Sequence, residues 1–289
     1  MKIGFIGLGI MGRPMALNLL KAGFDLAVWA RRPESMRPLL DAGAQGAASP
    51  ADLAGRVDLI ISMVADAPDV EAVMLGEQGV CQGARTGLVA VDMSTIAPAA
   101  ARGIAERLAG FGIDFVDAPV SGGEGSAIAG TLSIMAGGSV AAFERAKPVF
   151  AAMGRNIVHI GESGAGQVAK AANQILTGVG ILAVAEALNF ARRSGADPAK
   201  VREAMLGGAA YSRVLENHGQ RMLERNFKPG FKAWMHQKDM NIVMQSAHQL
   251  GLCLPTSAAA AQAFNAMVGS GLGEEDSLAV LKVLEGLSG

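Results

Sequence analysis

The first half of the chain alternates between short apolar runs and longer stretches with helical periodicity. Gly or Asp bounds the apolar runs, and their continuous hydrophobicity predicts strands buried on both faces of a parallel sheet. The stretches between them predict helices that cover this sheet, as in a Rossmann-type, doubly wound α/β domain. The strands are expected at Lys2–Gly7, Asp25–Trp29, Val57–Val64, Leu88–Asp92 and Ile113–Val116, and the helices at Ile10–Ala22, Pro33–Ala42, Pro68–Leu75 and Ala97–Ala109.

The strand pattern ends near residue 161, and everything after it is helical. Leu132–Ala136 and Asn156–Ile160 predict the last two strands, on either side of a helix at Ala141–Met153. Ala165–Arg193 predicts one long helix, because it contains no proline. We therefore expect an α/β domain over residues 1–162 and an all-α domain over residues 163–289, joined by a long interdomain helix. Further helical segments begin at Pro198, Ser212, Lys232, Thr256 and Glu275.

A glycine motif follows the first predicted strand and opens the first predicted helix. Its G-x-G-x-x-G spacing gives a tight turn at Gly7, lets the backbone approach a pyrophosphate at Gly9, and allows close helix–strand packing at Gly12. The helix end adds free N–H groups and a positive dipole. An ordinary glycine-rich turn could contain the same residues. The position of this motif in the alternating half of the chain favours dinucleotide binding, with Ile10 and Met11 among the contacts.

The end of the second predicted strand indicates which dinucleotide binds. Sites for NAD place an acid there, about 20 residues after the glycine motif, to hold the ribose 2′-hydroxyl. Here Trp29 is followed by Ala30, Arg31 and Arg32. A guanidinium fork suits a 2′-phosphate. The sequence therefore predicts NADPH, with NAD as the alternative, and Arg31 as the main phosphate ligand with Arg32 assisting. Two solvated loop arginines are the competing interpretation.

Composition narrows the remaining classes of protein. The 289 residues carry 25 basic and 26 acidic side chains, which disfavours nucleic acid as a partner, and a hydrophobic content of 51% excludes intrinsic disorder. Two cysteines give no disulfide framework and favour the cytoplasm, and the scattered histidines predict no metal site. The uncharged stretches 171–185 and 249–273 predict no membrane helix, because the first is short and Pro255 interrupts the second.

Four sequence blocks, in order along the whole chain, resemble the β-hydroxyacid dehydrogenases, the 3-hydroxyisobutyrate dehydrogenase-like family. They are the N-terminal block Phe5–Lys21, the block Asp117–Gly123 (DAPVSGG), the block Gly164–Lys170 (GAGQVAK), and the block that runs from Phe231-Lys232 to Lys238-Asp239. The resemblance implies a two-domain NAD(P)-dependent oxidoreductase.

Within this family, the subgroup of tartronate semialdehyde reductases is the most similar. The similarity lies in Asp92–Ser94, Ile96–Pro98 and Asn226–Phe231. The subgroup implies reduction of a small carboxylated aldehyde, with the corresponding hydroxy acid as product.

Lys170 is the candidate proton donor. Hydride transfer to an aldehyde leaves an alkoxide, which requires a proton or a positive charge. Lys170 is the single lysine between Lys147 and Lys200 and lies on an apolar helix, where burial would lower the pKa of a lysine. A surface lysine is the alternative interpretation, and the family block favours catalysis.

Two amides follow Lys170 on the same helix face. The family pattern has asparagine at the fourth position after the lysine, whereas this chain has Gln174 there and Asn173 one position before. We expect Asn173 to orient the substrate with Gln174 beside it, and which of the two does so stays open.

The other candidate residues lie in loops. Ser121, Gly122 and Gly123 can form a nest of N–H groups for a substrate carboxylate, and Asp117 is expected to fix their loop. The resemblance implies that Val64 and Thr95 contact the cofactor, and that Phe231 and Lys238 close over the nicotinamide and its ribose. Without the resemblance, these last two would be a core aromatic and a surface lysine.

The sequence thus predicts an NADPH-linked reductase, first of tartronate semialdehyde. The same chemistry on 3-hydroxyisobutyrate, succinic semialdehyde, glyoxylate or a sulfonated analogue is the main alternative. A non-catalytic dinucleotide-binding scaffold and an imine reductase are disfavoured by Lys170. Long apolar helices and the Ala-rich run Ala258–Ala263 predict a homodimer or homotetramer.

Overall fold

A computed structural model describes residues 1–288 of the chain. It divides into two compact units, Met1–Lys170 and a second unit that begins at Ala171. The division falls inside a long helix, whereas the sequence places the domain boundary at residues 162 and 163. The first turns of this helix bond to strand ends of the first unit, as described below.

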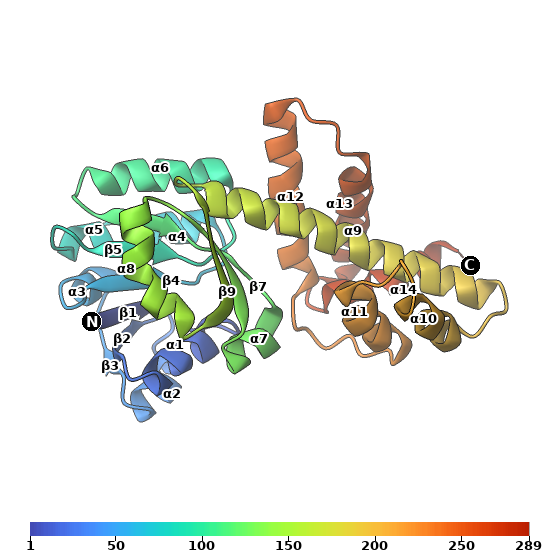
Figure 1. Cartoon of the computed structure of the whole chain (residues 1–289), viewed down its shortest axis with the longest axis horizontal. Helices are drawn as coiled ribbons and strands as arrows, with labels where there is room; N and C mark the ends of the chain where they lie inside the picture. The colour runs from blue at the N-terminus through green and yellow to red at the C-terminus, as the bar shows by residue number, and fades with distance from the viewer. Residues whose placement is uncertain (289) are drawn as a thin grey trace. The chain divides into compact units, whose positions relative to one another are not determined.

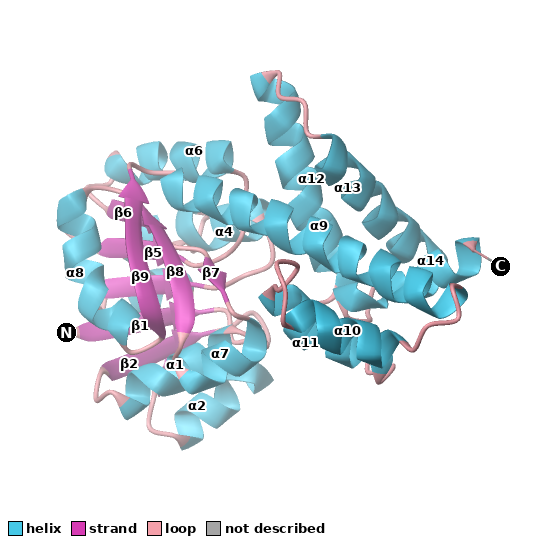
Figure 2. Ribbon diagram, turned by 45° about the vertical axis from the view of Figure 1, so that its right-hand side comes forward, coloured by secondary structure: helices cyan, strands magenta, loops and turns pink. Residues whose placement is uncertain are grey.

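The first unit is built on one sheet with the strand order β3-β2-β1-β4-β5-β6-β8-β7, and β9 pairs with β8 (Figures 1 and 2). The path from β3 to β6 is parallel throughout. The strands are β1 Lys2–Ile6, β2 Asp25–Trp29, β3 Gln45–Gly46, β4 Leu59–Ser62, β5 Val89–Asp92, β6 Asp114–Asp117, β7 Val120–Ser121, β8 Leu132–Gly137 and β9 Gly154–Gly161.

The strands of the alternating stretch are parallel, as predicted, and the sheet becomes mixed at the edge that holds the last two predicted strands. There β8 runs antiparallel to β6 and to β7, while β9 is parallel to β8. An apolar run predicts that a strand is buried and leaves its direction open, because direction depends on the route of the connection. The predicted fold class is confirmed, since the sheet is mainly parallel and helices cover both faces.

Helices cover both faces of the sheet because successive strand side chains point to opposite sides. On one face, Ile3 and Phe5 belong to a buried cluster with residues of α1, α2, α7 and α8. On the other face, Ile6 and Ile60 pack with residues of α3, α4, α5 and α6. The helices are α1 Gly12–Lys21, η1 Pro33–Met36, α2 Arg37–Asp41, α3 Pro50–Ala54, α4 Ala67–Leu75, α5 Val80–Gly83, α6 Pro98–Ala109, α7 Gly123–Ala129 and α8 Val140–Ala151.

Several short elements were not predicted, namely β3, α3, α5, β7 and α7. They are too short for a hydrophobic period to show. One of them carries a local signal all the same, because the Ser49 side chain caps α3 by accepting a hydrogen bond from Asp52 N–H, with Pro50 at the first helical position.

The second unit is helical. Helix α9 spans Ala165–Arg193, as predicted, and the Ser212 side chain caps α11. Ile181, Leu215, Met240 and Phe264 belong to its buried core. The other helices are α10 Pro198–Leu206, α11 Arg213–Leu223, α12 Ala233–Leu250, α13 Pro255–Met267, η2 Val268–Leu272, η3 Ser277–Ala279 and α14 Val280–Leu287.

Helix α9 is long and apolar enough to cross a membrane by length and composition alone. Half of its most apolar 18-residue window is buried inside the structure, and the core helix of a soluble protein satisfies the same criterion. The buried polar residues Lys170, Gln174 and Asn189 lie on the same helix.

Candidate active site

The glycine loop between β1 and α1 shows why two of its glycines are required. Gly7 has a φ of +92°, and a Cβ at this position would overlap the carbonyl oxygen of Met63. A Cβ on Gly12 would overlap the carbonyl oxygen of Gly7. A Cβ on Gly9 would meet no atom within 4 Å, so open space borders the backbone there. A bound ligand can therefore approach the protein backbone most closely at Gly9.

A cavity of about 400 Å³ lies beside this loop. Its polar lining comes from Arg13, Arg32, Ser35 and Glu124, and the rest is mainly apolar. Arg31 does not line this cavity. Its side chain is 85% exposed, and its Nη1 lies 3.3 Å from Oδ1 of Asp69. The two neighbouring arginines thus have different surroundings, which the sequence did not distinguish.

A buried carboxylate ties together the segments that follow β4 and β5. The hydroxyls of Ser62 and Ser94 donate hydrogen bonds to Asp92 Oδ1, with distances of 2.6 and 2.7 Å. Ser94 Oγ in turn accepts a hydrogen bond from Val64 N–H at 2.9 Å. The network fixes Val64, and Thr95 is the residue directly after Ser94. Sequence analysis missed this role of Asp92 and Ser62.

Asp117, at the end of β6, holds the start of α9. Its Oδ1 accepts a hydrogen bond from Gly164 N–H at 2.6 Å, and its Oδ2 accepts one from Gln167 N–H at 2.9 Å. Burial raises the pKa of this carboxyl to about 6, although the two N–H groups oppose the shift and the charge of Asp92 adds to it. Asp117 therefore binds the first turn of the long helix, whereas the sequence suggested that it fixes its own loop.

Gln167 connects the same helical turn to the segment after β5. Its Nε2 donates to the carbonyl oxygen of Ser94 at 2.8 Å, and its Oε1 accepts from Ile96 N–H at 3.1 Å. The two bonded residues, Ser94 and Ile96, lie directly before and after Thr95. Sequence analysis missed this residue, although a glutamine in the first turn of an apolar helix is a usable signal.

Lys170 lies three residues after Gln167 on α9, and it is 7% exposed. Residues at this spacing share a helix face. The bonds of Asp117 and Gln167 therefore fix the helical turn that carries Lys170 to the carboxyl ends of β5 and β6. Ligands of open α/β sheets bind at this end of the strands.

The Ser121-Gly122-Gly123 segment joins β7 to α7. Gly122 and Gly123 have φ values of +136° and +69°, and a Cβ on Gly122 would lie 2.5 Å from the Cβ of Ser126. Both glycines are needed for this turn, because residues that carry a Cβ rarely adopt these backbone angles.

In the second unit, the two amides after Lys170 have different environments. Gln174 is buried, accepts a hydrogen bond from Asn173 Nδ2 at 2.8 Å, and donates one to Asp239 Oδ2 at 2.7 Å. Asp239 also pairs with Lys238, at 3.2 Å. Asn173 is half-buried. Its Nδ2 also contacts Thr177.

Phe231 comes shortly before α12 in the second unit. Its ring meets His236 edge-on, with 5.5 Å between the centroids, and His236 stacks on Phe264 at 4.4 Å. Among residues 1–288, no group of three or more His, Cys, Asp and Glu side chains is arranged to hold a metal ion.

Comparisons with known proteins agree with this architecture. A family model for the NAD binding domain of 6-phosphogluconate dehydrogenase matches residues 2–161, and a second, described as "NAD-binding of NADP-dependent 3-hydroxyisobutyrate dehydrogenase", matches residues 164–284. The 2-hydroxy-3-oxopropionate reductase of Escherichia coli (strain K12) is 47% identical over 285 residues, which cover 99% of this chain and 97% of that protein.

Two 3-hydroxyisobutyrate dehydrogenases are also similar. The enzyme of Pseudomonas aeruginosa is 38% identical and covers 91% of each chain. The crystal structure of the enzyme from Salmonella typhimurium matches with a TM-score of 0.89 at 34% identity, covering 98% of this chain and 99% of that chain.

The fold, the glycine loop and these matches define an NAD(P)-dependent oxidoreductase. The chain belongs to the 3-hydroxyisobutyrate dehydrogenase-like family of hydroxyacid dehydrogenases. Both the family and the class of cofactor predicted from the sequence are confirmed.

Proposed function

We propose that this chain is an NADPH-dependent reductase that converts tartronate semialdehyde (2-hydroxy-3-oxopropionate) to D-glycerate. The observation that carries the proposal is the buried Lys170 on a helical turn bonded to the carboxyl ends of β5 and β6. The 47% identity to a 2-hydroxy-3-oxopropionate reductase over nearly the whole chain supports this substrate.

The first unit fits the cofactor. Gly7, Gly9 and Gly12 with Ile10 and Met11 would hold the pyrophosphate at the start of α1. Val64 and Thr95, in the segments fixed by the Asp92 network, would contact the nicotinamide half. From the second unit, Phe231 and Lys238 are the proposed contacts of the nicotinamide and its ribose. When bound, NADPH supplies a hydride to the aldehyde carbon.

Arg32 is the better candidate for the 2′-phosphate. It lines the cavity beside Gly9 together with Arg13, Ser35 and Glu124, so two cations and one carboxylate border this cavity. Arg31 lies outside the cavity, and its 85% exposed side chain already pairs with Asp69. We expect Arg32→Ala to reduce the preference for NADPH over NADH in kcat/KM more than Arg31→Ala does. An equal preference for the two cofactors in the unaltered protein would refute the assignment.

The remaining chemistry belongs to the side chains. As the hydride arrives, the aldehyde oxygen gains a proton from the Lys170 ammonium, and the resulting amine is reprotonated by solvent. Ser121 and the N–H groups of Gly122 and Gly123 would bind the substrate carboxylate. Asn173 would orient the substrate through its Oδ1, while Gln174 holds its Nδ2.

A panel of short aldehydes tests the proposal. NADPH oxidation is followed with tartronate semialdehyde, succinic semialdehyde, methylmalonate semialdehyde and glyoxylate, and kcat/KM is expected to be highest for the first. Lys170→Ala should lower kcat by about a thousandfold while cofactor binding persists. Lys147→Ala, on the exposed lysine that pairs with Glu144 on α8, is the matched control and should retain full activity.

The outcome also separates the alternatives. A higher kcat/KM for another carboxylated aldehyde would reassign the substrate within the family. Binding of NADPH without turnover of any carboxylated aldehyde would favour a dinucleotide-binding scaffold, and turnover of cyclic imines would favour an imine reductase.

We further propose a cytoplasmic homodimer or homotetramer. Both cysteines are free thiols, Cys81 buried and Cys253 exposed, which suits a reducing compartment. Leu176 and Phe190 on α9 are 76% and 74% exposed, and large exposed apolar side chains on one helix are typical of subunit interfaces. Light scattering of the unaltered protein and of Leu176→Asp tests this, and a monomer at micromolar concentration would refute it.

A further inference from the structure

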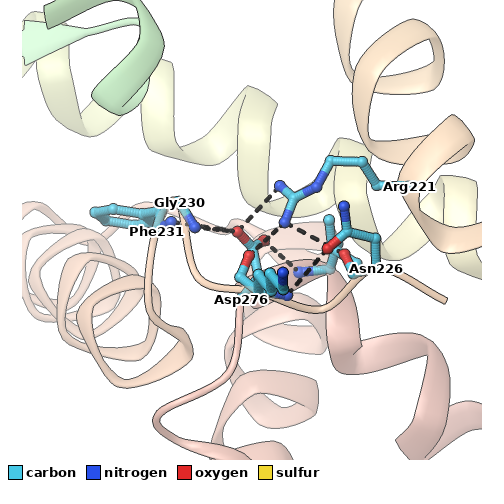
Figure 3. A network of polar contacts seen from close by, with 7 residues as sticks. Arg221, Asn226, Gly230, Phe231 and Asp276 are labelled. Carbon is cyan, nitrogen blue, oxygen red and sulfur yellow. Dashed lines mark hydrogen bonds and ion pairs between the residues drawn. The ribbon is translucent and has the colours of Figure 1, made fainter. Parts of the chain in front are cut away.

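An irregular loop precedes α12 in the second unit and ends at Phe231 and Lys232. We define the Phe231 loop as residues 224–232, between α11 and α12. Asp276, which is 2% exposed, accepts hydrogen bonds from this loop and from residues outside it (Figure 3). Its Oδ2 accepts from Gly230 N–H at 2.8 Å, from Phe231 N–H at 3.2 Å and from Arg221 Nη1 at 3.1 Å. Its Oδ1 accepts from Leu278 N–H at 3.2 Å.

Arg221, on α11, holds the other part of the same loop. Its Nη1 faces Asp276, and its Nη2 donates to the carbonyl oxygens of Asn226 at 3.3 Å and Lys228 at 2.5 Å. A guanidinium can satisfy acceptors in two directions at once because its donors form a rigid, planar fork. The ion pair between half-buried Arg221 and buried Asp276 is therefore bonded to the loop near its beginning and at its end.

The backbone of Phe231 is bound on both sides. Its N–H donates to Asp276, and its carbonyl oxygen accepts a hydrogen bond from Ser277 N–H at 3.0 Å. The segment has no regular secondary structure of its own, so these bonds determine where the half-buried ring lies. Burial lowers the pKa of the nearby His218, which favours its neutral form, so this side chain does not compete with Arg221 as a second cation.

We propose that Arg221 and Asp276 are positioning residues for Phe231, and through it for the contact with the nicotinamide that the proposed function assigns to this ring. The proposal rests on the proposed function, in which Phe231 contacts the cofactor. Neither residue touches the reacting atoms. They act by holding the Phe231 ring in one place, and a small displacement of a contacting group is sufficient to reduce turnover.

Asn cannot replace Asp276, although it has the same shape. An amide has a single acceptor oxygen, so its NH₂ would face either the three donors at Oδ2 or the N–H of Leu278. We expect Asp276→Asn and Arg221→Gln each to lower kcat by between about tenfold and a hundredfold, with binding of 2′,5′-ADP unchanged, since that fragment lacks the nicotinamide. Arg145→Gln, which removes the 3.4 Å ion pair to Asp114 in the first unit, is the control and should leave kcat unchanged.

The decisive test places both changes in a Phe231→Leu background. If the pair acts through Phe231, Asp276→Asn causes no further loss of kcat there, whereas a full additional loss would overturn the proposal. Unaltered kinetics in Phe231→Leu would also overturn it, while the loss of activity in Lys170→Ala would show that the proposed function still holds. If Asp276→Asn does not fold by circular dichroism, Arg221→Gln takes its place in the cycle.

A second measurement does not depend on activity. In the aromatic NMR spectrum of protein with ¹³C-labelled phenylalanine, the Phe231 resonance is assigned by its disappearance in Phe231→Leu. Asp276→Asn or Arg221→Gln should shift or broaden this resonance, and Arg145→Gln should not. If no aldehyde is reduced, this spectrum decides the proposal, because an unshifted Phe231 ring would overturn it.

Discussion

Replacing Asp117 with asparagine should change how the stability of the first unit depends on pH. The carboxyl group is fully buried, accepts two backbone hydrogen bonds at the start of α9, and has its pKa raised from 3.8 to about 6, chiefly by burial. Between these two pH values, the folded protein holds a proton on Asp117 that the unfolded chain has released. The free energy of unfolding therefore falls as the pH rises through this range.

The magnitude follows from the shift. About two pKa units correspond to about 3 kcal/mol at 1.36 kcal/mol per unit. This contribution is fully present below pH 3.8 and is lost once the pH exceeds about 6. Asparagine does not titrate, so the unaltered protein should lose about 2.4 kcal/mol of this contribution relative to Asp117→Asn between pH 4 and pH 7.

Urea unfolding at half-unit pH intervals measures this difference. Trp29 lies in the first unit and Trp234 in the second, so a Trp234→Phe background restricts the fluorescence signal to the first unit. Asp114→Asn, at the exposed end of the same strand, controls for the loss of one carboxylate. A difference between the unaltered protein and Asp117→Asn that stays constant within about 0.5 kcal/mol from pH 4 to pH 7 would refute the reasoning.

Three further predictions concern the site. Gln167→Leu leaves Ser94 C=O and Ile96 N–H buried without a partner, which should cost about 1–3 kcal/mol for each group and reduce kcat; an unchanged Tm would contradict this. Gly12→Ala should abolish NADPH binding measured by calorimetry, because the new Cβ overlaps the Gly7 carbonyl oxygen. Asn173→Ala should raise KM for the aldehyde about tenfold without changing NADPH binding, and equal KM values would count against its proposed role.

The sequence by itself determined the elements whose signals are local. The position of the glycine loop follows from strand, glycine spacing and helix within the first 21 residues. The bounds of α9 follow from an apolar, proline-free run bordered by glycine. This signal is local, so the helix can be predicted without knowing which segments pack against it. The four family blocks indicated the oxidoreductase class for the same reason, because each lies within one short stretch of the sequence.

Tertiary structure alone decided what depends on residues far apart in the chain. It turned Arg31 towards Asp69 and placed Arg32 in the cavity beside the glycine loop. It set the direction of β8, and it joined Gln167 to the segment around Thr95 and Arg221 to Asp276. Hydrophobic periodicity specifies which face of an element is buried, whereas the partner of a buried polar group is set by how the connections bring distant segments together.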